Sequence, residues 1–387
     1  MWEHVRLKYA CPKCLKTSPE SPSAASGPPT SHIVVAAKPA QPIYKGLPGP
    51  GLLAHVIMSK YADHQPLYRQ EAMLARQGVE LSRSTLADWM AASAELLKPL
   101  YQLMRTQVLL GRVVQTDETR VPVLQPGLKK TKSGRLWIYV GDRNHPHLVY
   151  DYTPTKARDG PAAILKNYKG FLQADAANVF DGFYLPGGIV EVGCMAHARR
   201  YFFDARDTDA ARSAEALTRI RDFYRVEDDA RELITRQQLA GDAADAIRRQ
   251  LRQERTKEKL VAFAAWLEDQ APRVLPKSPI GHAIAYARRQ WTALMRFIEH
   301  GFLNIDNNAS ERALRAVAVG RKNWLFAGSD AGGRTAAVLY TMTQTCRRHG
   351  VDPFVYLKDV LERLPNSPLD DLPRFLPDRW ALPNHAD

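Results

Sequence analysis

The sequence predicts an α/β protein in which helices cover both faces of a mixed β-sheet and a long helical segment interrupts the sheet-bearing part. Three observations support this: β-branched runs recur over residues 112–194, strand patterns vanish over 207–301, and helical spacing governs 52–110. At 387 residues the chain has room for two or three domains of about 150 residues each. With 45% hydrophobic and 25% charged residues, its composition argues against disorder and against a disulfide scaffold.

Positive charge predominates in the chain. Lys and Arg number 54 against 41 Asp and Glu, which gives a formal net charge of +13. This excess favours a polyanionic partner, and nucleic acid is the first candidate. No apolar run approaches the roughly 18 residues of a membrane span, and the charged start Met1–Ala10 lacks the apolar core of a signal peptide. We therefore expect a cytoplasmic protein, associated with the nucleoid when bound to DNA, and no membrane partner.

A spacer and a helical region precede the predicted strands. Residues 17–50 are dense in Pro, Ser and Gly and are predicted to form a linker. Within residues 51–110 apolar residues recur at helical spacing, and Ser82 or Ser84 caps the third of three helices. The layout is similar to a helix-turn-helix whose residues 84–89 enter a DNA groove, and it is equally typical of an ordinary three-helix unit.

The strand-bearing part begins after Gly111. Its predicted elements are strands at 112–121, 135–140 and 147–152, a helix at 158–168, strands at 171–175 and 188–194, and a helix carrying His197 and Arg199. Three successive strands followed by alternating helices and strands form the element order of a ribonuclease-H-like fold. Long charged helices replace strand patterns over residues 207–301, which we interpret as a helical insertion.

Three acidic residues occupy the positions at which this fold binds metal ions. Ribonuclease-H-like enzymes hold two divalent metals about 3.5–4 Å apart with carboxylates from the first strand, the fourth strand and a late helix. The corresponding residues are Asp117, Asp175 and Glu311. Hard oxygen ligands suit Mg²⁺ or Mn²⁺, so we expect two such ions.

Each of these carboxylates also has a purely structural interpretation. Asp117 is consistent with the end of a strand, Asp175 with the cap of a following helix, and Asn308 with Glu311 forms a capping-box pattern. The agreement of all three positions with the fold favours the catalytic interpretation. Supporting or solvent-exposed roles are assigned to the neighbouring acidic residues Asp181, Glu118 and Asp306.

Basic residues near the carboxylates favour phosphate binding. Those assigned to DNA are Arg312, Arg315, Arg321 and Lys322 after Glu311, Lys129, Lys130 and Lys132 at a hairpin tip, and Arg199 beside His197. An ordinary ion pair is the alternative for the arginines, and a solvated hairpin for the lysines. Cys194 and His197 have the spacing of two zinc ligands, but we interpret them as a packed junction between a strand and a helix. Cys346 follows an apolar stripe and is predicted to lie in the core.

Several longer stretches carry a resemblance to a known family. They include TDETRVPVL, GRLWIYVGD, YDYTPTKARDGPAAIL, LQADAANVFDGFY, GCMAHARRYFFDA, DNNASERALRAVAVGRKNWLFAGSDAGG and TCRRHGVDPFVYLKDVLERLP. With YACPKC near the start, the matching stretches extend from about residue 9 to residue 365. The chain resembles transposases of the bacterial insertion sequence 66 family.

The resemblance implies a chemistry for the acidic residues. The family motifs place an Asp, Asp, Glu triad on Asp117, Asp175 and Glu311, in a ribonuclease-H-like domain with a helical insertion. Such an enzyme cleaves a DNA strand by water attack and then uses the freed 3′ hydroxyl to attack target DNA. We therefore expect double-stranded DNA, as transposon ends and target, to be the partner of a homo-oligomer, together with accessory proteins of the same element.

Two departures from the family pattern concern the second Asp and the start of the chain. Ala176–Phe180 stands where family members usually carry aromatic and Gly residues. Near the start, Cys11 and Cys14 are the second cysteine pair of a zinc-finger-like module whose first pair is missing. A structural zinc site needs about four ligands. We therefore do not expect zinc in this chain and interpret residues 1–16 as a remnant of that module.

These observations combine into one division of the chain. The expected segments are 1–16, the remnant; 17–50, the linker; 51–110, the helix-turn-helix-like DNA-binding region; 111–206, the first part of the catalytic core; 207–301, the helical insertion; 302–345, the last part of the core with Glu311; and 346–387, a C-terminal family segment. Two alternatives to an active transposase remain open. One is a shortened DNA-binding remnant unable to mobilise DNA, and the other is a general ribonuclease-H-like nuclease.

Overall fold

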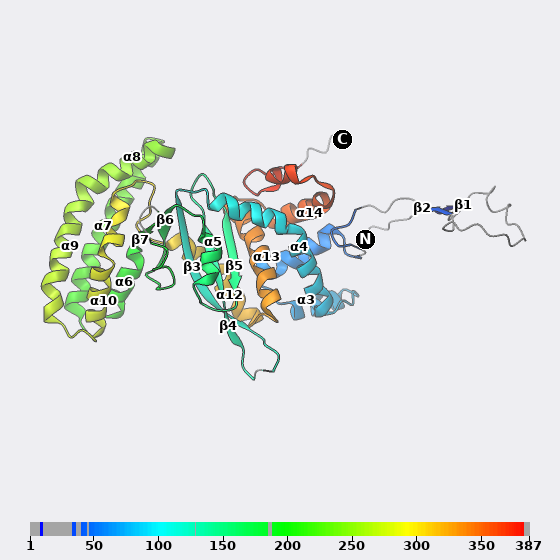
Figure 1. The fold of residues 1–387 in the computed structure, drawn as a ribbon, viewed down its shortest axis with the longest axis horizontal. Helices are drawn as coiled ribbons and strands as arrows, with labels where there is room; N and C mark the ends of the chain where they lie inside the picture. Colours follow the sequence, from blue (N-terminus) through cyan, green and yellow to red (C-terminus); the bar gives the residue numbers. More distant parts are fainter. Residues whose placement is uncertain are drawn as a thin grey trace, which may run out of the picture.

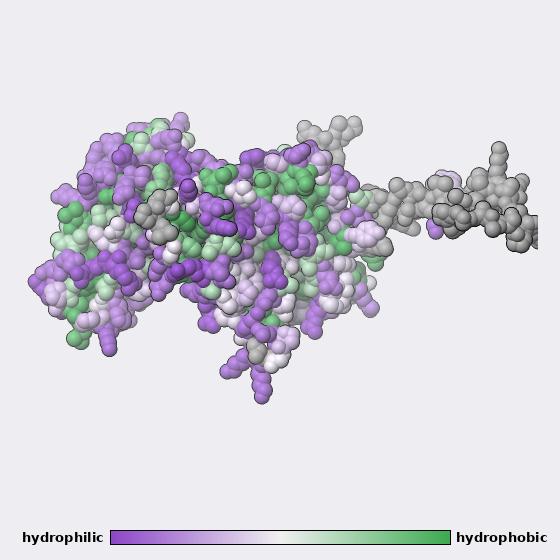
Figure 2. All heavy atoms as spheres, viewed as in Figure 1, coloured by the Kyte–Doolittle hydropathy of each residue, from purple (hydrophilic) through white to green (hydrophobic). Residues whose placement is uncertain are grey.

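The computed structural model describes residues 8–10, 33–35, 40–44, 46–127, 129–184 and 188–382. The predicted cysteine pair Cys11 and Cys14, most of the predicted linker and the hairpin residue Leu128 lie outside these ranges. Figure 1 shows a central sheet with one group of helices at one end and the helices from both ends of the chain at the other. On the face drawn in Figure 2, hydrophilic side chains cover most of the surface and hydrophobic ones occur in small groups.

The main sheet has five strands and mixed direction, as predicted. They are β3 (Val113–Val123), β4 (Lys132–Val140), β5 (Leu148–Thr153), β6 (Gly170–Gln173) and β7 (Ile189–Val192), in the spatial order β5-β4-β3-β6-β7. The first three pair antiparallel, whereas β6 and β7 run parallel to β3. Helix α5 (Asp159–Leu165) links β5 to β6 and is shorter than predicted. A separate antiparallel pair joins β1 (Lys8–Ala10) to β2 (Ile33–Val35).

Helix α13 (Asp330–Arg348) closes the β5 edge of the sheet. The Thr345 hydroxyl accepts from Leu148 N at 3.1 Å and donates to Leu148 O at 3.1 Å, and the Thr341 hydroxyl accepts from Tyr150 N at 2.9 Å. An uncovered strand edge is a template for pairing with other chains. The two threonines satisfy part of that edge, which explains why polar residues lie in the buried face of this helix.

Three helices precede the sheet, and they share its hydrophobic core. They are α2 (Pro50–Tyr61), α3 (Leu67–Arg76) and α4 (Arg83–Val108), and Ser82 caps α4 by accepting from Thr85 N at 3.1 Å. Buried residues of α2 and α4 belong to one cluster with Trp137 of β4 and Leu339 of α13. These helices therefore pack on the sheet and contribute to its hydrophobic core. A helix-turn-helix role for them stays a prediction.

A second hydrophobic cluster lies in the helices between residues 195 and 298, which we call the helical region. They are α6 (Met195–Asp204), α7 (Ala210–Arg236), α8 (Gly241–Leu251), the π-helical turn Arg252–Thr256, α9 (Lys257–Gln270), α10 (Pro279–Arg289) and α11 (Trp291–Met295), with short 3₁₀ turns at Ala271–Arg273 and Arg296–Ile298. Phe202, Phe223 and Phe263 are fully buried there. All regular elements over this stretch are helices, in agreement with the loss of strand patterns in the sequence.

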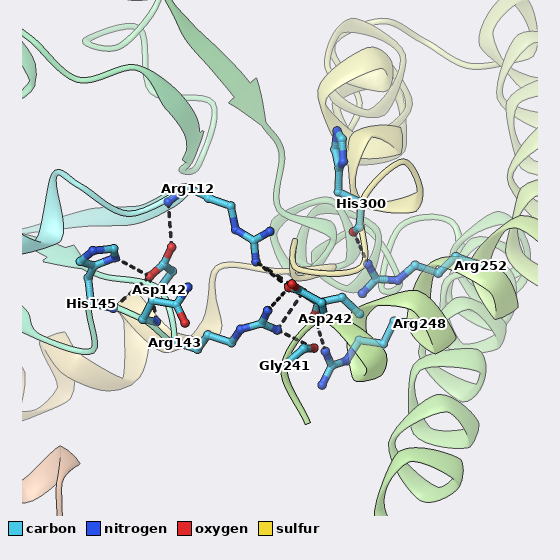
Figure 3. A network of polar contacts seen from close by, with 11 residues as sticks. Arg112, Asp142, Arg143, His145, Gly241, Asp242, Arg248, Arg252 and His300 are labelled. Atoms are coloured by element: carbon cyan, nitrogen blue, oxygen red, sulfur yellow. Dashed lines mark hydrogen bonds and ion pairs between the residues drawn. The ribbon is translucent and has the colours of Figure 1, made fainter. Parts of the chain in front are cut away.

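A polar network joins the helical region to the sheet (Figure 3). Arg143, after β4, donates to Gly241 O at 2.8 Å, to Asp245 Oδ2 at 2.7 Å and to Asp242 Oδ1 at 2.6 Å. Arg112, just before β3, lies 3.5 Å from Asp245 Oδ2. We call Arg112, Arg143, Asp242 and Asp245 the polar clasp. It fixes the start of α8 against the sheet.

The chain returns to the sheet through α12 (Asn308–Trp324) and continues into α13, α14 (Pro353–Arg363) and the 3₁₀ turns Leu364–Asn366 and Leu369–Phe375. Cys346 is buried in α13, as predicted. Among the described residues, no helix combines the length and the apolar character needed to cross a bilayer.

Candidate active site

The strands β3 and β6 place Asp117 and Asp175 at neighbouring positions. Gln115 pairs with Gln173 in parallel register, and each aspartate follows its glutamine by two residues. Adjacent strands lie about 4.8 Å apart. The two aspartates therefore each lie two residues beyond a pair of neighbouring backbone positions. Asp117 lies within β3 rather than at its end, and a turn instead of a helix follows Asp175. The strand-end and helix-cap interpretations of these residues are therefore wrong.

Buried Asn307 attaches the start of α12 to β3. Its Nδ2 donates to Thr116 O at 2.8 Å, and its Oδ1 accepts from the Ser310 hydroxyl at 2.8 Å. Thr116 directly precedes Asp117, and Glu311 follows Asn307 by about one helical turn. The contact therefore brings the third predicted carboxylate to the part of β3 that carries the first.

Glu311 does not take part in the predicted capping box. The helix begins at Asn308 and its N-cap is Asn307, so Glu311 is the fourth residue of the helix and not the third after a cap. The Asn308 N–H donates instead to Asp306 Oδ1 at 3.1 Å. The capping interpretation of Glu311 is wrong, because Asp306 and not Glu311 accepts the hydrogen bond from the Asn308 N–H.

Two buried glutamines connect all the segments that carry the carboxylates. Gln115 Nε2 donates to Gln173 Oε1 at 2.7 Å and to Asp306 O at 3.2 Å. Gln173 Nε2 donates in turn to Asn304 O at 2.8 Å and Gly193 O at 3.1 Å. We call these two residues the glutamine pair. The sequence carries a signal for it, because a polar Gln stands two residues before each aspartate and directly follows apolar residues of its strand.

The carboxylates interact electrostatically. Burial and the negative charges of Asp175, Glu311 and Glu118 together raise the pKa of Asp117 to about 7, although the Glu118 N–H, which donates to Asp117 Oδ1 at 2.7 Å, opposes the shift. Repulsion of this kind is relieved by a divalent cation placed between the groups. The arrangement thus concentrates negative charge at one point of the sheet.

The donor set suits a hard divalent cation, although Glu311 is engaged elsewhere. Its Oε1 lies 3.5 Å from His197 Nε2 and its Oε2 lies 3.5 Å from Arg200 Nη2, both on α6. Within the described ranges, no group of three or more acidic, His or Cys side chains already has the geometry of a metal site. Oxygen ligands fit Mg²⁺ or Mn²⁺. To bind such an ion, Glu311 has to give up its two long contacts with His197 and Arg200 of α6.

Two of the three predicted supporting acids, Glu118 and Asp306, have side-chain partners. Glu118 lies 2.9 Å from Lys156 Nζ and 3.6 Å from Arg135 Nη1. Asp306 Oδ2 accepts from the Tyr224 hydroxyl at 2.9 Å. Asp181 is exposed in a turn after β6.

Of the basic residues assigned to DNA, two are engaged in contacts within the protein and six are exposed. Lys132 is bound to Asp330 Oδ2 at 2.6 Å, and Arg321 donates to Thr119 Oγ1 at 3.0 Å and to a backbone carbonyl. The others are exposed: Lys129, Lys130, Arg199, Arg312, Arg315 and Lys322. Among the described residues Glu311 pairs with α6 and not with Arg315, so the ordinary ion pair considered for Arg315 is wrong.

The Cys194 and His197 junction is packed as predicted. Cys194 is fully buried, its Sγ accepts from Asn307 N at 3.2 Å, and burial raises the pKa of its thiol to about 11. The protonated thiol is a poor metal ligand because metals bind the thiolate. Cys194 therefore acts as part of the attachment of α12.

Comparisons with known proteins agree with this architecture. Residues 45–335 match the model of the transposase IS66 family, and residues 341–377 match the IS66 C-terminal element. Three proteins of Sinorhizobium fredii, all named as uncharacterized, are similar along most of the chain. The protein y4qI is 36% identical over 360 residues, 89% of this chain and 65% of its own length. The protein y4hP is 31% identical over 99% of this chain and 69% of its own length. The protein y4jD is 32% identical over 97% of this chain and 72% of its own length.

The chain thus spans about two thirds of the length of these relatives. The family match covers the sheet, the helical region and the helices that return to the sheet, and so includes every residue of the candidate site. On these matches, the chain belongs to the IS66 family of transposases.

Proposed function

We propose that this chain is the catalytic part of a DNA transposase, in which Asp117, Asp175 and Glu311 hold two Mg²⁺ or Mn²⁺ ions. Family membership supports the transposase role. The order of three antiparallel strands followed by two parallel ones supports the ribonuclease-H-like core, with the helices within residues 207–301 as its insertion. The DNA substrate is supported by the net charge of +13.

One observation carries the assignment of the site: the negative charges of Asp175 and Glu311, which come from separate elements, both act on Asp117 and raise its pKa. Asp117 comes from β3, Asp175 from the end of β6 and Glu311 from α12, and they lie far apart in sequence. Carboxylates brought together at a partly buried point, with Glu311 held only by two contacts of 3.5 Å, destabilise a fold unless they have a function. The glutamine pair and Asn307 maintain this arrangement, which makes it a built feature of the fold.

The proposed reaction assigns a role to each group. The bound cations would activate a water molecule and stabilise the leaving 3′ oxygen of the cleaved strand. Asp117 would hold the cations from β3 and Asp175 from the segment just after β6, and Glu311 would complete the set from the first turns of α12. The freed 3′ hydroxyl, kept at the same point, would then attack a phosphodiester of target DNA, forming a new phosphorus–oxygen bond and displacing the target strand's own 3′ oxygen.

The first prediction tests these ligands. Asp117→Asn and Glu311→Gln each remove a metal-binding oxygen with almost no change of shape, so they should abolish Mg²⁺-dependent strand cleavage and leave DNA binding intact. Strand cleavage is measured on DNA carrying the inverted repeats that flank the gene, with binding measured in parallel. Asp181→Asn is the matched control, because this acid is exposed in a turn, and it should retain activity.

Cleavage by either variant at the wild-type rate would remove the assignment. Cleavage without dependence on the inverted repeats would indicate the general nuclease instead. Binding with no cleavage by the wild-type chain would indicate the DNA-binding remnant.

A further inference from the structure

We infer that the helical region provides a phosphate-binding cleft beside Glu311, which holds the backbone of the DNA strand to be cut. The inference rests on the proposed function and extends it to residues of α6 and α7. A cleft of about 630 Å³ opens between α6, α7 and the start of α12. Its lining includes Arg199 and Arg200 of α6, Arg221 and Tyr224 of α7, and Glu311 itself. The volume lies within the range of about 300–1,000 Å³ that is usual for ligand clefts.

Arg221 differs from its neighbours on α7. The other arginines in the body of this helix form ion pairs one turn away: Arg212 with Asp209, Arg219 with Glu215, Arg225 with Asp222 and Arg231 with Asp228. Arg221 has no acidic residue three or four positions away in either direction. It is exposed, and within the described part of the chain it makes no ion pair. Its charge is therefore available to an anion in the cleft.

The two arginines of α6 add to this positive charge. The Arg199 guanidinium lies 5.8 Å from the centre of the Phe203 ring and has no carboxylate partner among the described residues. The Arg200 side chain is 60% exposed, and its contact with Glu311 is 3.5 Å long. An exposed ion pair of this length contributes little to stability. Three guanidinium groups thus face a single carboxylate, and guanidinium groups bind phosphate oxygens through paired hydrogen bonds.

The cleft is attached firmly to the candidate catalytic carboxylates. The Tyr224 hydroxyl donates to Asp306 Oδ2 at 2.9 Å, and Asp306 also accepts from Asn308. These contacts connect α7 to the segment that begins α12. A phosphodiester bound by Arg221 and Arg199 would therefore lie beside Glu311. A DNA strand supplies several such phosphates in a row, which suits a cleft extending along two helices better than a single free anion does.

The test compares Arg221→Ala with Arg225→Ala, a matched variant on the same helix whose arginine is paired with Asp222. Binding to a random-sequence DNA duplex is measured over a range of salt concentrations, without divalent metal. Loss of one phosphate contact should reduce the slope of log affinity against log salt by about 0.9. We expect this reduction for Arg221→Ala, about twice that for Arg199→Ala combined with Arg221→Ala, and no change for Arg225→Ala.

Equal slopes for Arg221→Ala and Arg225→Ala would overturn the inference, because both charges would then act only as part of a general surface potential. Saturable binding of inorganic phosphate alone that Arg221→Ala abolishes would also overturn it, by showing a small-anion site. Neither variant should unfold, since both arginines are exposed and Ala favours helices. The measurement needs no cleavage, so failure of the proposed catalytic ligands leaves it interpretable.

Discussion

Asp117 combines burial with the charge of three neighbouring carboxylates, those of Asp175, Glu311 and Glu118. Its pKa of about 7 stands well above the 3.8 of an ordinary Asp. Between these two values the folded chain keeps a proton that the unfolded chain has released. The stability contributed by this proton is therefore lost as the pH rises from about 4 to about 7.

The second prediction follows from that sign. Asp117→Asn carries no charge at any pH, so its melting temperature should exceed that of the wild type by an amount that grows between pH 4 and pH 7 and is constant above. Thermal unfolding at pH 5 and pH 8 in the absence of metal measures the difference. At pH 8, added Mg²⁺ should stabilise the wild type and leave the variant unchanged. A pH-independent difference between the two proteins would contradict the environment assigned to Asp117.

At the scale of elements, the glutamine pair determines how β3, β6 and α12 meet. Gln115 donates to the Asp306 carbonyl and to the side chain of Gln173. Gln173 donates to the carbonyls of Asn304 and Gly193. A buried carbonyl left without a donor costs about 1–3 kcal/mol. The pair is therefore expected to behave as a unit.

The third prediction concerns this unit. Gln115→Leu and Gln173→Leu should each lower the free energy of unfolding by about 2–4 kcal/mol, because the first removes two hydrogen bonds and the second removes three. The double variant should lose less than the sum of the two, since the contact between the glutamines is removed only once. Urea unfolding measures all three, with exposed Gln102→Leu as control. Strict additivity would show that the two amides act independently.

The elements themselves were largely predictable from local patterns, and the contacts between them were not. All five strands of the sheet and the Ser82 cap follow from β-branched runs and a Ser before a helical pattern. The start of α12 was misplaced by one residue because Asp306, a neighbour with its own tertiary contacts, binds the Asn308 N–H. The Glu311 contacts with α6 join residues more than a hundred positions apart, which no local periodicity encodes. The identity of the metal ligands stays a prediction.

At the scale of the whole molecule, the positive charge and the packing of helices α2 to α4 lead to a prediction about how the proposed DNA partner would be recognised. Leu86 is fully buried in the core shared with the sheet, whereas Ser84, Ala87 and Asp88 are exposed. A short exposed face of this kind offers few base-edge contacts, and base-edge contacts are the source of sequence selectivity.

The fourth prediction is that the chain alone binds DNA with steep salt dependence and little preference for transposon ends. Phosphate neutralisation by a chain of charge +13 supplies affinity for any duplex. Affinities for inverted-repeat and random duplexes at physiological salt should differ by less than about a hundredfold, or 2.7 kcal/mol. A larger preference would show that residues 51–110 read the ends unaided.

The threonine contacts that close the edge of β5 form only after the ribosome has synthesised α13, so the β5 edge stays open during much of translation. Leu148 and Thr345 are 197 positions apart, an interval that takes a ribosome about 10–40 s at usual rates of elongation. During that time the nascent chain presents an open strand edge, and open edges pair with other chains. A message that ends before α13 therefore yields a product with an uncovered sheet, prone to aggregation and proteolysis, whether or not Glu311 has been made.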